Sequence, residues 1–213
     1  MNDQQTPHKD LNLILTPHGM VFGITAVPTD TTNAPFALGI HGLSQRNSSS
    51  TWAGMLDPFA EAGYRFLSVD MPGWGMSDPW EDEAGAPIHG REVILTLLDS
   101  LEEPEAILVG KSWGGGLALE VALSQPERVT ALVLTAPAYS GDLADLARLS
   151  QPVLIAWAED DPVIPISRAK QLADALPTAE LIVYKTGGHS AAQNNLDDFA
   201  PRAIQFLRKH GIR

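Results

Sequence analysis

The sequence predicts an α/β protein with a doubly wound, mostly parallel sheet that carries helices on both faces. Along the 213 residues, short apolar runs alternate with longer segments whose apolar side chains have helical spacing. One apolar run, at residues 106–110, leads through Gly-Lys-Ser-Trp-Gly directly into a helix-forming segment. Strands that alternate with helices in this way are typical of a parallel sheet with crossover helices.

The expected elements follow one another without a visible linker, repeat or low-complexity tract. Residues 1–10 are polar and are expected to form a flexible N-terminal tail. Residues 11–15 and 20–27 are expected to be the two strands of a hairpin. Further strands are expected at residues 36–40, 64–70, 106–110, 129–135, 153–158 and 181–184. Helices are expected at residues 52–62, 88–101, 112–124, 167–176 and 196–210, a short helix at 143–149, and loops at 44–51 and 80–87.

A single domain is expected for residues 1–213. A chain with 44% hydrophobic residues and this length can bury a substantial core, and α/β domains of this size usually form one unit. Only about sixteen residues, 136–151, separate two of the expected strands. This segment has room for a loop and one short helix, so we expect no cap domain above the sheet.

Charge and composition exclude several classes of function. A net charge of −12 argues against nucleic acid or an anionic membrane as a partner. The absence of cysteine excludes disulfides, thiol catalysis and thiolate metal sites. The first residues show no signal-peptide pattern, and no apolar run approaches the roughly 20 residues of a membrane span. A cytoplasmic protein is therefore expected.

No cofactor and no metal are expected. The carboxylates are not grouped with histidines along the sequence, as a metal site would require. Residues 114–116 are three glycines, but the Lys-Ser/Thr pair of a phosphate-binding loop does not follow them. The expected partner is a small-molecule substrate, and the sequence does not indicate an oligomeric state.

The pentapeptide from Gly110 to Gly114 presents Ser112 as a candidate nucleophile. A serine in a sharp turn between a strand and a helix is crowded, so glycines are needed two residues before and two residues after it. Such a turn projects the hydroxyl above the sheet edge and directs the positive N-terminus of the helix at the reacting centre. The alternative is a structural glycine turn that happens to contain a serine.

A serine nucleophile needs a base to accept its proton, and the base needs an acid that orients it. In open α/β sheets, reactive groups lie in the loops at the carboxyl ends of the strands. Asp160 and Asp161 follow the strand expected at residues 153–158, and His189 follows the strand expected at 181–184. The sequence therefore contains Ser, Asp and His in the order that accompanies a nucleophile elbow.

At these motifs the chain resembles the α/β-hydrolase family, from about residue 12 to its C-terminus. His41-Gly42-Leu43 resembles the family's oxyanion loop, and residues 70–78, Asp-Met-Pro-Gly-Trp-Gly-Met-Ser-Asp, resemble a structural loop of the family. Residues 158–165 resemble its acid loop, with Ala158 where a glycine is common, and Gly188-His189 resembles its final Gly-His. The resemblance implies an α/β-hydrolase fold, here without the helical cap that many relatives insert after the sixth strand. A serine nucleophile points away from epoxide hydrolases and haloalkane dehalogenases, which use a carboxylate.

The resemblance also implies which carboxylate is the catalytic acid. The spacing to Pro165 places Asp161 at the family's catalytic position, which leaves Asp160 as a neighbour or turn-forming residue. Some relatives carry the acid after the sixth strand, so Asp142 stays an alternative.

The resemblance implies an oxyanion hole made of the backbone N–H groups of Leu43 and Trp113. Trp74 and Trp113 are candidates for an apolar wall that binds the substrate, with packing in the core as the alternative. His41 is expected to order its own loop through hydrogen bonds. Lys111 is expected to face solvent.

The predicted function is a capless serine hydrolase, resembling carboxylesterases, that cleaves an ester or a similar activated acyl group through an acyl-enzyme on Ser112. Without a cap the site is expected to be an open cleft, which favours short acyl groups. One alternative is a thioester, amide or carbon–carbon bond hydrolase with the same triad. Another is a hydrolase-like interaction or ligand-sensing protein with weak turnover.

Overall fold

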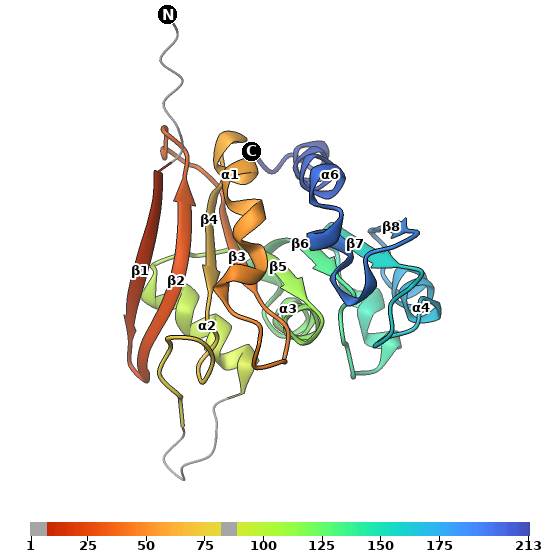
Figure 1. The fold of residues 1–213 in the computed structure, drawn as a ribbon, viewed down its shortest axis with the longest axis horizontal. Helices are drawn as coiled ribbons and strands as arrows, with labels where there is room; N and C mark the ends of the chain where they lie inside the picture. The colour runs from red at the N-terminus through yellow and green to blue at the C-terminus, as the bar shows by residue number, and fades with distance from the viewer. Residues whose placement is uncertain (1–7, 82–88) are drawn as a thin grey trace, which may run out of the picture.

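Eight strands in the described part of the chain form one sheet, in the order β1-β2-β4-β3-β5-β6-β7-β8 (Figure 1). The structure is a computed structural model, and it describes residues 8–81 and 89–213. The hairpin strand β2 is antiparallel to both of its neighbours, and all other pairs are parallel. The strands are β1 (His8–Thr16), β2 (Gly19–Val27), β3 (Phe36–Ile40), β4 (Arg65–Val69), β5 (Ala106–Lys111), β6 (Val129–Thr135), β7 (Val153–Ala158) and β8 (Ala179–Tyr184).

Helices cover both faces of the sheet, which confirms the predicted doubly wound fold. Helices α1 and α6 pack on one face, and α2, α3 and α4 pack on the other (Figure 1). Every residue of β3 and β7 is buried, because parallel strands between two helical layers have no solvent face. The α-helices are α1 (Ala53–Glu61), α2 (Gly90–Ser100), α3 (Trp113–Ser124), α4 (Ser167–Ala175), α5 (Ala191–Asn194) and α6 (Leu196–Lys209).

The connection between β6 and β7 leaves the carboxyl ends of the central strands without a cap. It is described throughout and contains the short 3₁₀ helix η3 (Leu143–Arg148), where the sequence predicts a short helix. The Asp142 side chain accepts a hydrogen bond from the backbone N–H of Ala144, which caps the N-terminus of η3. No cap domain is present between these two strands.

Two of the larger differences from the sequence prediction are at the start of β1 and in the predicted loop at 44–51. Strand β1 begins at His8, so three residues of the predicted tail belong to the sheet, where they pair with β2; residues 1–7 lie outside the described residues. The predicted loop at 44–51 ends in a 3₁₀ helix, η1 (Ser49–Trp52), because the Ser48 hydroxyl caps it by accepting from Ser50 N–H. Most of the predicted loop at 80–87 also lies outside the described residues. In the described segments, no helix is both long and apolar enough to cross a membrane.

Candidate active site

Ser112 lies in a tight turn between β5 and α3, with the strained backbone angles φ 51° and ψ −116°. This positive φ is uncommon for a residue other than glycine and marks a backbone that its surroundings hold in place. The Ser112 N–H donates to the carbonyl of Thr135 at 3.0 Å, and its own carbonyl accepts from Ala138 N–H at 2.8 Å. Gly110 allows the turn to close, because a Cβ atom there would lie 2.6 Å from Cα of Gly115.

The structure brings Ser112, His189 and Asp161 together, although 77 residues separate the serine from the histidine. Nε2 of His189 lies 2.8 Å from Oγ of Ser112. On the other side of the ring, Nδ1 lies 2.9 Å from Oδ2 and 3.2 Å from Oδ1 of Asp161. Three consecutive hydrogen-bonding groups of this kind can carry a proton away from the serine hydroxyl.

The Asp161 carboxylate is held in a fixed orientation. Its side chain is fully buried, and Oδ1 accepts from the backbone N–H groups of Val163 at 2.8 Å and Ile164 at 3.0 Å. Oδ2 is thereby left to face His189. A carboxylate fixed in this way orients the imidazole and stabilises a positive charge on it.

The two alternative carboxylates lie elsewhere. Asp160 accepts hydrogen bonds from the backbone N–H groups of Gly188 at 2.8 Å and Gly187 at 3.4 Å. It therefore shapes the turn that precedes His189, where both glycines have positive φ. Asp142 caps η3, as described above. Asp161 is thus the one of the three candidates that the structure places against the imidazole.

The loop after β3 lies against the nucleophile turn, since a Cβ atom on Gly42 would lie 3.5 Å from Cβ of Ser112. His41 is fully buried, and its Nε2 accepts from Met71 N–H at 3.0 Å. The protonated Nδ1 then donates to the Gly42 carbonyl at 2.8 Å. Burial lowers the pKa of His41, so the ring stays neutral and orders this loop as the sequence predicts.

The two expected oxyanion donors belong to this loop and to the start of α3. Trp113 is the first residue of α3, so its N–H has no acceptor within the helix. Leu43 is exposed, and its carbonyl accepts from Nε1 of Trp74 at 3.2 Å. The Trp74 and Trp113 rings stack at a centroid distance of 5.2 Å with an interplanar angle of 26°. Both rings are half-buried and pack against the core, as the packing alternative expects, and their role in binding substrate stays a prediction.

Comparison with known proteins shows the family to which this fold belongs. A sequence model described as alpha/beta hydrolase fold matches residues 38–149, which is more than half of the chain. The chain belongs to the α/β-hydrolase fold family. A second model, described as TAP-like protein, matches residues 135–209.

Two relatives and one solved structure show the range of this family. ABHD14B of Rattus norvegicus, provisionally classed as a protein-lysine deacylase, is 30% identical over 179 residues, covering 80% of this chain and 81% of the relative. A Burkholderia vietnamiensis hydrolase named for 2-hydroxy-6-oxononadienedioate and 2-hydroxy-6-oxononatrienedioate is 26% identical over 260 residues, covering 85% of this chain and 89% of its own. A CIB-like hydrolase of Thermoplasma acidophilum has a TM-score of 0.86 at 24% identity, covering 95% and 99% of the two chains, which shows the shared fold.

The sequence predicts that Lys111 faces solvent, but in this α/β hydrolase its side chain is half-buried. Its Nζ donates to Oγ of Ser190 at 2.7 Å. Burial lowers the pKa of Lys111, and the nearby Asp161 charge acts in the opposite direction. Strand alternation could have predicted this burial, because it places Lys111 on the same face of β5 as the buried Ile107 and Val109.

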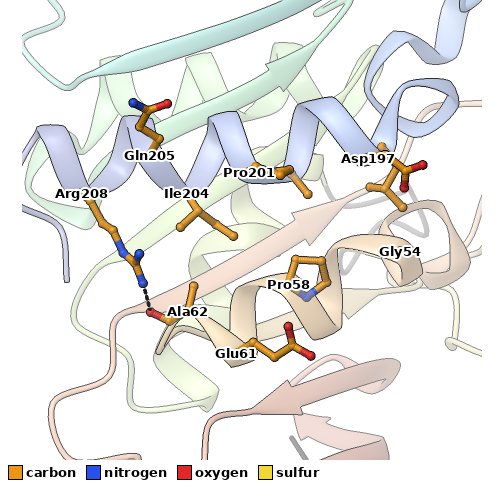
Figure 2. Close-up of a pocket in the computed structure, with 11 residues that line it drawn as sticks. Gly54, Pro58, Glu61, Ala62, Asp197, Pro201, Ile204, Gln205 and Arg208 are labelled. Atoms are coloured by element: carbon orange, nitrogen blue, oxygen red, sulfur yellow. Dashed lines mark hydrogen bonds between the residues drawn. The ribbon is translucent and has the colours of Figure 1, made fainter.

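A separate groove of about 830 Å³ runs between α1 and α6 (Figure 2). Its walls include Gly54, Pro58, Pro201 and Ile204, and Arg208 donates to the Ala62 carbonyl at one end. These residues come from the two helices rather than from the loops that carry Ser112 and His189. Across residues 8–81 and 89–213, no group of three or more His, Asp and Glu side chains could hold a metal ion.

Proposed function

We propose that this chain is a serine hydrolase that cleaves a carboxylic ester, or a similarly activated short acyl group, through an acyl-enzyme on Ser112. The observation that carries the proposal is the 2.8 Å contact between Oγ of Ser112 and Nε2 of His189. It is extended by the 2.9 Å contact between Nδ1 of His189 and the buried Asp161. The family supplies the reaction class, since its members named above are hydrolases.

In the proposed reaction, Ser112 Oγ attacks the acyl carbon while Nε2 of His189 takes the hydroxyl proton. The tetrahedral intermediate collapses when the bond to the leaving group breaks, and the imidazolium returns its proton to the leaving oxygen. Water then attacks the acyl-enzyme with His189 again as the base, which releases the acid and restores Ser112. Asp161 stabilises the imidazolium and keeps its Nδ1–H directed away from the serine.

The negative charge of the intermediate needs two donors that are in place before the reaction begins. The N–H of Trp113 is at the positive N-terminus of α3, and the N–H of Leu43 comes from the loop that lies against Ser112. Removing one such donor typically costs about 3–4 kcal/mol of barrier. Because backbone N–H groups stabilise the charge, the side chains of Leu43 and Trp113 remain free to form the substrate-binding surface with Trp74.

The preference for short acyl groups rests on the connection between β6 and β7, which provides no cap over the site. In a deep apolar pocket, each additional buried CH₂ contributes about 0.8 kcal/mol of binding. In an open cleft most of that contribution is absent. We therefore expect kcat/KM for p-nitrophenyl esters to peak between acetyl and butyryl. A steady rise of kcat/KM through the octanoyl ester would contradict the open cleft. The mass of the protein in solution, determined in parallel, would show whether a second subunit covers the site.

A second candidate is hydrolysis of an amide or a carbon–carbon bond with the same three residues. The relatives favour it, because one is provisionally classed as a protein-lysine deacylase and the other is named for 2-hydroxy-6-oxo dienedioates. Parallel assays with an acetylated lysine peptide and with a vinylogous 1,5-diketone separate these reactions from ester hydrolysis. Turnover of none of the three, by a folded preparation, would favour the interaction or ligand-sensing protein instead.

A further inference from the structure

The half-buried Lys111 is the last residue of β5 and directly precedes the proposed nucleophile. Its ammonium reaches across to η4 (Gly188–Ser190) and donates to Oγ of Ser190 at 2.7 Å. Ser190 in turn directly follows His189. A single side chain therefore connects the strand that carries the nucleophile to the turn that carries the proposed base.

The turn that carries His189 is closed by a hydrogen bond from the Ser190 N–H to the Gly187 carbonyl at 3.2 Å, and side chains from outside the turn restrain it further. Gly187 and Gly188 have φ values of 142° and 56°, and His189 itself departs from helical geometry at φ −76°, ψ 17°. On the N-terminal side, Asp160 accepts from the N–H of Gly188. On the C-terminal side, Nδ2 of Asn194 donates to the Gly187 carbonyl at 2.8 Å, and the contact from Lys111 holds the Ser190 side chain. The imidazole is thus held from both directions along the chain.

An ammonium at this position is costly unless it contributes to the site. Desolvation disfavours the charged form of a buried lysine, and burial does lower the pKa of Lys111. Strand alternation places the stem of Lys111 beside Ile107 and Val109, where an apolar side chain would pack without that penalty. The penalty is partly offset by the hydrogen bond to Ser190 and by the charge of Asp161.

We propose that Lys111 is a positioning residue that acts through Ser190 to hold His189 against Ser112. The inference rests on the proposed function of Ser112, His189 and Asp161. Because the contact fixes geometry rather than substrate, its loss lowers kcat and leaves KM nearly unchanged. A displacement of the base by about 1 Å is enough to slow catalysis by about 100-fold.

The test is a double-mutant cycle with Lys111→Met, Ser190→Ala and the double variant, assayed with a short p-nitrophenyl ester. We expect each single variant to lower kcat by about tenfold, with KM within about twofold. The double variant should lose no more kcat than the less active single variant, because both substitutions break the same contact. Lys170→Met is the matched control, since that lysine is exposed on α4 and pairs with Asp174. A rise in KM at constant kcat, a silent Ser190→Ala, or losses that multiply in the double variant would overturn the proposal.

A measurement on the resting protein separates this inference from the proposed function. In crystal structures of Lys111→Met and Ser190→Ala, we expect Nε2 of His189 to lie about 1 Å farther from Oγ of Ser112 than the 2.8 Å of the unchanged chain. The Lys170→Met structure should keep the original distance. If the wild-type protein hydrolyses nothing while this displacement is seen, the proposed function fails and the effect of Lys111 on His189 stands. If the wild type is active, Ser112→Ala is inactive, and Lys111→Met changes neither kcat nor this distance, the positioning role is wrong.

Discussion

Replacing Asp161 with asparagine tests the proposed acid at nearly constant shape. The oxygen Oδ1 of Asp161 accepts from the N–H groups of both Val163 and Ile164. An asparagine keeps these two bonds only if its carbonyl oxygen takes the Oδ1 position. The flipped orientation would point the amide NH₂ at two backbone donors. The structure therefore predicts that the NH₂ group occupies the Oδ2 position, next to Nδ1 of His189.

That orientation reverses the hydrogen bond to the imidazole. An amide NH₂ donates to Nδ1, so the ring proton moves to Nε2, the nitrogen that lies 2.8 Å from Oγ of Ser112. A protonated Nε2 cannot accept the serine proton. When the catalytic aspartate of a serine protease is replaced by asparagine, the same tautomer change lowers kcat by about 10⁴-fold. Each tenfold step is about 1.36 kcal/mol, so the expected rise of the barrier is about 5.4 kcal/mol.

The assay is the kcat of p-nitrophenyl acetate hydrolysis for Asp161→Asn beside Asp160→Asn. The neighbouring substitution is the matched control, because an asparagine at position 160 can still accept from the N–H of Gly188. We expect the control to lose less than about tenfold, since it replaces one hydrogen bond to a carboxylate with a weaker one. A larger loss of kcat for Asp160→Asn than for Asp161→Asn would refute the assignment. A loss of kcat in neither variant would indicate Asp142 as the acid.

Two further predictions concern the loop after β3. Because burial lowers the pKa of His41, the unfolded chain binds a proton near pH 6.5 that the folded chain resists. The free energy of unfolding should therefore fall as the pH drops below about 6.5, and urea titrations should show a shallower fall for His41→Asn; equal slopes would contradict the neutral, buried His41. Trp74→Phe removes the N–H that donates to the Leu43 carbonyl while keeping an aromatic ring beside Trp113. We expect kcat/KM to fall by about three- to tenfold, the effect of one hydrogen bond, and an unchanged kcat/KM would show that this bond does not hold the oxyanion loop.

The sequence was sufficient to predict the sheet, its helical layers and the meeting of Ser112, Asp161 and His189. The physical reason is that each residue follows a strand, and the carboxyl ends of parallel strands meet at one edge of the sheet. The missing cap could be predicted because about sixteen residues, 136–151, cannot form a separate domain. The order and length of the elements are enough for these conclusions, except that the choice of Asp161 over Asp160 also depends on the resemblance of residues 158–165 to the family's acid loop.

What the sequence could not supply are contacts that depend on the path of the loops. Lys111 contacts Ser190 only because η4 turns back toward β5, and no periodicity in the sequence describes that turn. The bond from Trp74 to the Leu43 carbonyl likewise joins two loops that follow different strands. Strand β1 begins earlier than predicted, because pairing with β2 extends to the polar residues from His8 onward. A hydrophobic pattern alone cannot show such pairing.

The central claim is that Ser112 carries a nucleophile activated by His189, and covalent labelling tests it most directly. A fluorophosphonate probe should label the native protein at one peptide, the one that contains Ser112, with complete loss of label after heat denaturation. Ser112→Ala should take up no probe and hydrolyse no ester while keeping the wild-type far-UV circular dichroism. Labelling at another residue, or ester hydrolysis that persists at the wild-type rate in Ser112→Ala, would contradict the account.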